Sequence, residues 1–148
     1  MIVNFGNTCK INAARFGATI QPRFNYFYFL FDEIKKGFTT SCRPFIGVDG
    51  CHLKTKYEGT LLIVVGGDPN DQYYPLDFGV CETESKESCR WFLTLLLEDV
   101  GQHKIWIFIS DQQKGLIPVF EEMFERVDHR LCLRHLYANF KNKFGGRT

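Results

Sequence analysis

The sequence predicts one α/β domain: a mixed sheet of three antiparallel strands followed by alternating helices and strands, flanked by helices. Two observations support this. Short apolar runs separated by turn residues occupy residues 45–82, and from Cys89 the apolar residues recur with a helical period. The chain has 148 residues, of which 45% are hydrophobic. That is enough for one hydrophobic core and too little for two.

The first part of the chain is weakly patterned. Residues 1–22 show no periodicity and are interrupted by Gly6, Gly17 and Pro22, so we expect irregular backbone there. The aromatic run that begins at Phe24 predicts either a strand or a short helix, and it is too short to span a bilayer. We therefore divide the chain into an upstream segment, residues 1–43, and a domain, residues 44–148.

Three strands are expected next. They are Phe45–Asp49, Leu61–Gly67 and Tyr73–Glu82. Turn signals separate them, at residues 57–59 and 67–71. Short connections between neighbouring strands predict an antiparallel meander.

The pattern then changes to that of an amphipathic helix. Ser85 is a plausible N-cap and Gly101 a plausible stop, and one face carries Cys89, Phe92, Leu93, Leu96, Leu97 and Val100. The apolar run Ile105–Ile109 follows and predicts a strand buried on both faces. Helix and strand therefore alternate after the meander.

Two more helices and a short strand complete the chain. Residues 116–127 predict a helix with Pro118 in its first turn, and residues 129–133 a short fifth strand. The last helix carries an apolar face of Leu133, Leu136, Tyr137, Phe140 and Phe144. We expect Phe140 and Phe144 to leave apolar surface uncovered, so that the isolated chain self-associates or is marginally stable.

Charge and cysteine content narrow the classes of function. The net charge of +1 does not indicate a polyanionic partner, but the residues after Asp128 include basic side chains and no acids. This basic tail is either a solvated helix face or a patch that contacts phosphates. The six cysteines form no CxxC pair and no signal peptide precedes them, which predicts reduced thiols in an intracellular protein.

Two aspartates follow apolar strands. Asp49 and Asp111 each end such a run. If the strands are ordered 3-2-1-4, the first and fourth are parallel neighbours, and the two carboxylates lie side by side. A divalent cation, Mg²⁺ or Mn²⁺, would then relieve their repulsion. The alternative is that both are helix N-caps or loop residues.

Other side chains are weaker candidates. Cys132 and His135 are one helical turn apart and could form half of a zinc site, or be a buried cysteine beside a histidine at a helix start. His52 could contact a phosphate. Glu82 and Glu84 lie after the third strand, and Glu87 or Asp77 could join the two aspartates as a third acid.

Several longer motifs resemble those of the Mutator-like (MULE) transposases. The resemblance covers roughly residues 23–146. It is carried by residues 42–54, 109–116 and 132–140, with Lys36-Gly37-Phe38, Tyr74-Pro75 and Trp91-Phe92-Leu93 in the same order as in the family.

The resemblance implies an RNase H-like fold and a DDE mechanism. Asp49 would be the first acid and Asp111 the second, both holding Mg²⁺ or Mn²⁺. The Cys132/His135 pair matches a CxxH signature with a structural or DNA-facing role, and a bound Zn²⁺ is possible there. The third acid, a glutamate beyond a helical insertion, and a SWIM zinc segment are expected outside this sequence, which ends at Thr148.

The same resemblance implies transposon-end DNA as the partner, nuclear localisation and possible homo-oligomers. The side chains expected to contact DNA are His52, Lys54, Lys114, Arg130, Arg134, Lys141 and Lys143.

Three functions follow from these observations. The first is a fragment of a transposase core, or a decayed copy, without catalysis of its own. The second is a domesticated module that binds nucleic acid or protein. The basic tail is the observation that supports it. The third is an RNase H-like nuclease that uses an internal acid such as Glu87.

Overall fold

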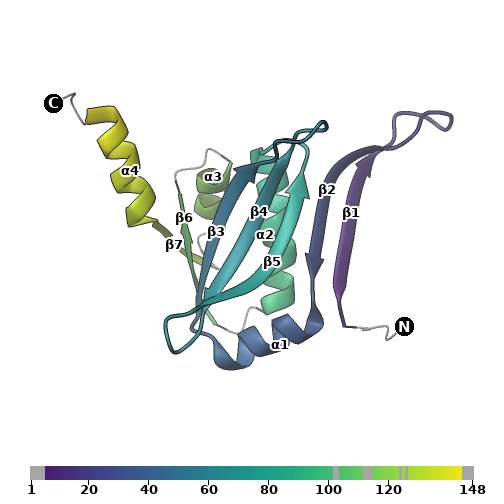
Figure 1. The fold of residues 1–148 in the computed structure, drawn as a ribbon. Coiled ribbons are helices and arrows are strands. Elements are labelled where there is room, and N and C mark those ends of the chain that lie inside the picture. Colours follow the sequence, from purple (N-terminus) through teal and green to yellow (C-terminus); the bar gives the residue numbers. More distant parts are fainter. Residues whose placement is uncertain (1–5, 102–103, 112–114, 124, 126, 145–148) are drawn as a thin grey trace.

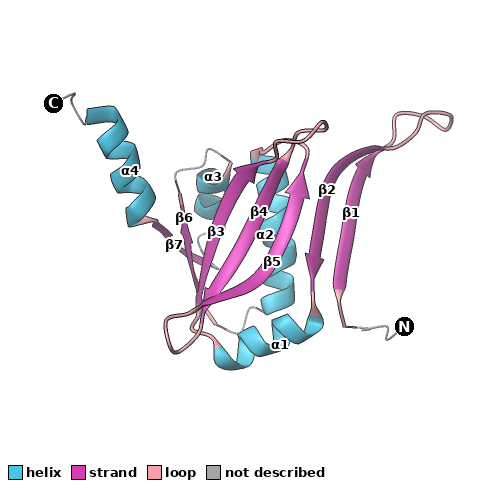
Figure 2. Ribbon diagram, viewed as in Figure 1, coloured by secondary structure: helices cyan, strands magenta, loops and turns pink. Residues whose placement is uncertain are grey.

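The computed structural model describes residues 6–101, 104–111, 115–123, 125 and 127–144 of the chain. The elements in order are β1 (Thr8–Ala14), β2 (Arg23–Leu30), α1 (Asp32–Ser41), β3 (Phe45–His52), β4 (Thr60–Gly67), β5 (Tyr73–Cys81), α2 (Lys86–Val100), β6 (Trp106–Ser110), α3 (Leu116–Glu122), β7 (Val127–Leu131) and α4 (Leu133–Phe144). Figure 1 labels them, and Figure 2 separates helix from strand.

The strands form one seven-stranded sheet in the order β1-β2-β5-β4-β3-β6-β7. Strands β3, β4 and β5 form the predicted antiparallel meander. Strands β6 and β7 then add in parallel beside β3. The expected mixed sheet is therefore confirmed, including the order 3-2-1-4 in which the first and fourth predicted strands are parallel neighbours.

Helices α2 and α3 cover one face of this sheet. Figure 1 shows α2 and α3 behind the strands, whereas none of the described helices lies across the front of the meander. The core lies between α2, α3 and the rear face, where Leu62, Val64, Leu96 and Phe108 are buried. Helix α4 projects from the sheet edge beyond β7.

The ends of α2 follow the predicted capping chemistry. The Ser85 hydroxyl accepts a hydrogen bond from the Ser88 amide at 3.1 Å, and the Ser88 hydroxyl accepts one from the Ser85 amide at 2.9 Å. These reciprocal bonds form a capping box that begins the helix. Gly101 ends it with φ +84°, a conformation that glycine adopts without strain.

The upstream segment corrects one expectation and decides between two alternatives for another. Residues 8–14 form a strand rather than irregular backbone, and the aromatic run forms strand β2 and leads into helix α1. Strand β2 pairs with β5, so the β1–β2 hairpin continues the same sheet. Strand β1 was not recognisable because both of its faces are largely exposed, which removes the alternation of apolar residues.

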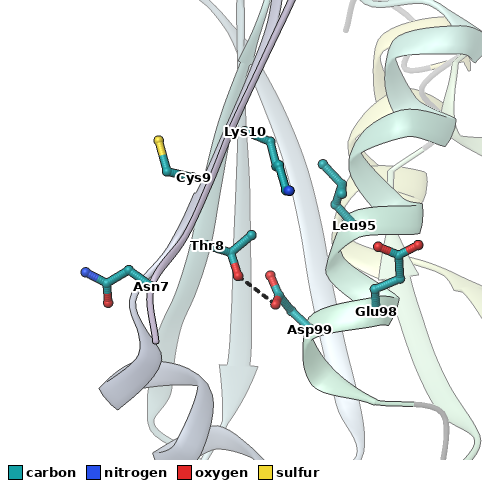
Figure 3. A pocket seen from close by; sticks show the side chains of 7 residues that line it. All are labelled: Asn7, Thr8, Cys9, Lys10, Leu95, Glu98 and Asp99. Carbon is teal, nitrogen blue, oxygen red and sulfur yellow. Dashed lines mark hydrogen bonds between the residues drawn. The ribbon is translucent and has the colours of Figure 1, made fainter. Parts of the chain in front are cut away.

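Polar contacts hold this hairpin against α2. Asp99, near the end of α2, accepts hydrogen bonds from the Thr8 hydroxyl at 2.8 Å and the Tyr28 hydroxyl at 2.7 Å. A cavity of about 330 Å³ lies beside these contacts. Figure 3 shows Thr8 and Lys10 directed toward α2 and Cys9 directed away from it. This cavity contains none of the residues for which the sequence predicted a role.

Two boundaries near the C-terminal part of the sheet also differ from expectation. Helix α3 ends at Glu122 rather than near Val127, and Val127 is instead the first residue of β7. Strand β7 spans residues 127–131 because its parallel register with β6 places Val127 opposite Trp106, where it is buried. The predicted strand at 129–133 was therefore shifted by two residues.

Among the described residues, no helix combines the length and apolar character needed to span a bilayer. All six cysteines are free thiols.

Candidate active site

The two candidate aspartates lie at the point where the parallel pairing of β3 and β6 stops. The last registered pair is Val48 with Ser110. Asp49 directly follows Val48, and Asp111 directly follows Ser110. One expectation needs correction, because Asp49 does not end its strand. Strand β3 continues to His52 by pairing with β4, with Asp49 opposite Ile63. The sequence could not show this, since the continuation depends on a partner strand.

Alternation along β3 decides which face carries the carboxylate. Ile46 and Val48 are buried in the core, whereas Gly47 and Asp49 lie on the other face of the sheet. Asp49 is exposed, and its Oδ1 accepts a hydrogen bond from the Gly50 amide at 2.9 Å. The carboxylate is therefore available to solvent on the face that α2 and α3 do not cover.

A cavity of about 520 Å³ joins the two aspartates to the CxxH signature. Its apolar lining includes Phe45, Ile63, Val65, Tyr73 and Ile109, and its polar lining includes Asp49, Asp111, Cys132, Arg134 and His135. The polar residues come from β3, the end of β6 and the start of α4. Segments that are far apart in the sequence therefore meet at one site.

Cys132 lies between β7 and α4 in the chain, and hydrogen bonds join it to β6 and to α4. Its amide donates a hydrogen bond to the Ser110 carbonyl at 2.7 Å, and its carbonyl accepts one from Leu136 at 2.9 Å. His135 lies in the first turn of α4, where its Nδ1 is buried and has no hydrogen-bond partner in the described part of the chain. The described part of the chain contains no group of three or more His, Cys, Asp or Glu side chains placed to hold a metal ion. Zinc at Cys132 and His135 therefore stays a prediction.

The internal acids fall at three different places. Glu87 is exposed on α2, and Asp77 is buried on β5. Half-buried Glu84, in the loop before α2, is the acid whose charge is coupled to the candidate site. Burial raises the pKa of Glu84, Asp111 raises it further, His52 lowers it and Asp49 raises it. Sequence reasoning placed Glu84 after the third strand but favoured Glu87 and Asp77.

The loop that carries Glu84 closely approaches Gly115, which precedes α3. A Cβ atom on Gly115 would lie 3.1 Å from the Ser85 carbonyl oxygen, so the two backbones approach closely. This approach holds the Glu84 loop beside the start of α3. A close glycine contact of this kind has no signature in a single sequence.

Sequence reasoning also missed Ser110 and His129. Ser110 is 1% exposed, and its hydroxyl lies 2.9 Å from His129 Nε2. Burial lowers the pKa of His129, and the charge of Arg130 lowers it further, against the opposing effects of Asp128 and Glu121. A short polar side chain before a strand-ending aspartate was the available signal, but its partner is 19 residues away.

The candidate DNA contacts are distributed over several elements. Arg134 lines the cavity, whereas Lys141 and Lys143 are exposed further along α4. His52 and Lys54 are exposed at the end of β3 and in the following loop, and Thr60 Oγ1 lies 3.5 Å from His52 Nδ1. Arg130 is exposed and paired with Asp128. Lys114 lies outside the described residues.

The sheet and site together define the class of protein. Three antiparallel strands are followed by parallel strands, with one carboxylate in β3 and one directly after its parallel neighbour β6. This is the arrangement expected for an RNase H-like domain. The family model described as the MULE transposase domain matches residues 45–139, which is more than half of the chain. This chain belongs to the MULE transposase domain family.

No curated protein sequence matches the chain. Among solved structures, it is similar to a chain of the cryoEM structure of the simian T-cell lymphotropic virus intasome in complex with PP2A regulatory subunit B56 gamma. The identity is 11% and the TM-score 0.46, over 70% of this chain and 43% of that one. The present chain therefore spans less than half of that solved chain.

Proposed function

We propose that this chain supplies part of the core of a DDE-type transposase, in which Asp49 and Asp111 hold a divalent cation for cleavage of DNA. The supporting observation is their position. They follow the last registered pair of two parallel strands and line one cavity together with the CxxH signature. In this function the protein acts on DNA in the nucleus.

The donor atoms suit such an ion. Two carboxylates on one cavity offer the hard oxygen ligands that Mg²⁺ and Mn²⁺ prefer. When bound there, the ion would supply activation of a water molecule and stabilisation of the leaving 3′ oxygen of a phosphodiester. Asp49 and Asp111 contribute by holding negative charge next to the last registered pair of the two parallel strands, Val48 and Ser110.

Arg134 and His135 line the same cavity. A guanidinium group presents donors that suit phosphate oxygens, and Arg134 is placed on the same cavity as the two aspartates. We propose that Arg134 binds the DNA backbone near the scissile phosphate. Lys141 and Lys143 extend basic charge along α4 and would add salt-dependent affinity.

Cleavage needs a third carboxylate at this site. The described residues bring no third His, Cys, Asp or Glu within reach of a shared ion. The family resemblance assigns that role to a glutamate that follows the CxxH signature. We therefore propose that the two aspartates bind metal without catalysing cleavage by themselves, and that the activity belongs to the longer protein.

Glu84 motivates a second candidate, an RNase H-like nuclease with an internal acid. The charges of both aspartates raise the pKa of its carboxyl group. Its loop closely approaches Gly115 through the Ser85 carbonyl. A small movement of this loop would bring a third carboxylate toward the pair. The DDE core remains the better supported function, because three motifs of the family carry it.

Calorimetric titration with Mn²⁺ tests both candidates. We expect the wild-type chain to bind Mn²⁺ and the Asp49→Asn/Asp111→Asn variant to lose binding, because both oxygen ligands are weakened. The charge-matched control is Glu33→Gln/Glu98→Gln, which alters two exposed carboxylates that do not line the cavity and should bind as the wild type does. Circular dichroism would establish that each variant is folded.

Single variants separate the two candidates in the same titration. Glu84→Gln should weaken Mn²⁺ binding only if Glu84 contributes to the site, and Glu87→Gln is its exposed control. Unchanged binding in Glu84→Gln removes the internal-acid nuclease. Binding retained by the double aspartate variant, or no binding by folded wild-type protein, would reject the proposed metal site.

A further inference from the structure

A partly buried pair of hydrogen bonds, a relay, joins His129 through Ser110 to the backbone of Asp111. The Ser110 hydroxyl is 3.0 Å from the Asp111 carbonyl oxygen and 2.9 Å from His129 Nε2. The carbonyl can only accept, so the single hydroxyl proton is donated to Asp111. His129 must therefore donate Nε2–H to the serine oxygen, and this assigns the tautomer of the neutral ring.

The imidazole is held by three elements. His129 belongs to β7, where its backbone pairs opposite Phe108 of β6. Its ring stacks on Phe120 of α3, with centroids 4.2 Å apart and planes inclined by 12°. The donor is thus fixed in direction before it reaches Ser110, and the relay transmits the position of the α3–β7 layer to the end of β6.

The backbone on both sides of Asp111 is restrained as a result. The Ser110 carbonyl accepts from the Cys132 amide at 2.7 Å, and the Asp111 carbonyl accepts from the Ser110 hydroxyl. Asp111 itself lies just beyond the last residue of β6, outside the strand ladder. Without these bonds the peptide that carries its carboxylate would have fewer restraints on its orientation.

From this geometry we propose that His129 is a positioning residue that orients Asp111 through Ser110. The inference rests on the proposed role of Asp111 as a metal ligand. Groups that orient metal ligands from behind typically change metal affinity by about 10- to 100-fold when removed. His129 has no contact with substrate in this role, and its effect reaches the site only through the serine hydroxyl.

Variants of His129 distinguish the effect of its N–H donor from the effect of its ring packing against Phe120. His129→Phe keeps an aromatic ring against Phe120 and removes the N–H donor, so Mn²⁺ affinity should fall by about 10-fold or more. His129→Gln restores an N–H near the position of Nε2 and should bind near the wild-type level. Ser110→Ala should match His129→Phe, and the double variant should lose no more than either single variant, because both remove one pathway.

Met123→Ala is the control for a general loss of core packing. Met123 packs against the same core from the end of α3 and makes no bond in the relay, so this variant should keep its Mn²⁺ affinity. Equal affinities for wild type and His129→Phe would overturn the inference, as would an equal loss in Met123→Ala.

A nitrogen-15 NMR spectrum of the His129 ring tests the hydrogen bonds of the relay in the absence of metal. The wild-type chain should show protonated Nε2 and unprotonated Nδ1 at His129, and the Cys132 amide should exchange faster in His129→Phe. If wild-type protein with this tautomer fails to bind Mn²⁺, the proposed function fails while the relay stands. A proton on Nδ1 instead of Nε2 would overturn the relay itself.

Discussion

At the scale of single residues, Asp77 is a buried acid whose ionisation should affect folding. It lies on β5 beneath α2, 7% exposed, and its Oδ2 has no hydrogen-bond partner among the described residues. Its Oδ1 accepts from the Phe78 amide at 2.6 Å, while the nearby Tyr28 hydroxyl donates to Asp99. Burial raises the pKa of Asp77 from 3.8 to about 8, so the neutral acid is the form that folding favours.

This shift predicts that the protein loses stability as pH rises. The folded state holds a proton on Asp77 that the unfolded state releases, so the contribution is complete below about pH 4 and lost by about pH 8. The free energy of unfolding should fall by up to about 1.4 kcal/mol per pH unit within that window. Urea unfolding at several pH values measures the slope.

Asp77→Asn is the decisive variant for this prediction. Asparagine resembles the neutral acid in shape and cannot ionise, so its unfolding free energy should vary less with pH and exceed that of the wild type at pH 8. Glu33→Gln, a change on the exposed face of α1, should leave the wild-type slope in place. Parallel slopes for wild type and Asp77→Asn would show that Asp77 does not control the pH dependence.

At the scale of secondary structure elements, a glycine sets how closely α2 packs on the sheet. Gly79 of β5 pairs with Leu62 of β4 and Tyr28 of β2. A Cβ atom there would overlap the ring of Phe92 and lie 2.9 Å from the Phe27 carbonyl oxygen. Phe92 therefore occupies the space above this glycine, where its ring meets Tyr28 edge-on at 5.4 Å.

Gly79→Ala should accordingly destabilise the fold. Overpacking of a well-filled core costs about 1–3 kcal/mol, because neighbouring side chains leave their preferred rotamers. Gly17→Ala is the matched control, since its Cβ would meet nothing closer than Ile20 Cδ1 at 3.7 Å. Equal urea midpoints for Gly79→Ala and wild type would show that α2 can shift away without cost.

At the scale of the whole molecule, the covering of the sheet is one-sided. On the face away from α2, Phe78 and Ile63 are 41% and 40% exposed, and Phe27 and Phe29 lie beside Phe78. Leu133 and Phe140 of α4 are 77% and 62% exposed. The side chain of Phe144 lies outside the described part of the structure. Apolar surface is thus present on both the open face and the projecting helix.

We therefore expect the isolated chain to self-associate. Light scattering should show an apparent mass that rises with concentration, because association buries apolar surface. Leu133→Ser/Phe140→Ser should shift the profile toward monomer, whereas Lys141→Ser, a polar change on the same helix, should not. A monomeric wild type at every concentration would contradict this prediction.

The sequence by itself determined the central architecture. The strands of the meander, the boundaries of α2 and the existence of a strand after it followed from apolar period, turn residues and caps. These are local signals, because a strand or helix that must bury one face shows its period within a few residues. The motifs around Asp49, Asp111 and Cys132 were visible for the same reason and agree with the family match over residues 45–139.

Only the tertiary structure decided the features that depend on distant partners. Strand β1 exists by pairing with β2, and Asp49 lies inside β3 because β4 extends the pairing beyond the end of β6. The coupling of Glu84 to the site and the Ser110–His129 relay join segments that the sequence keeps apart. Their cause is the burial of polar groups, which must find hydrogen-bond partners wherever the fold places them.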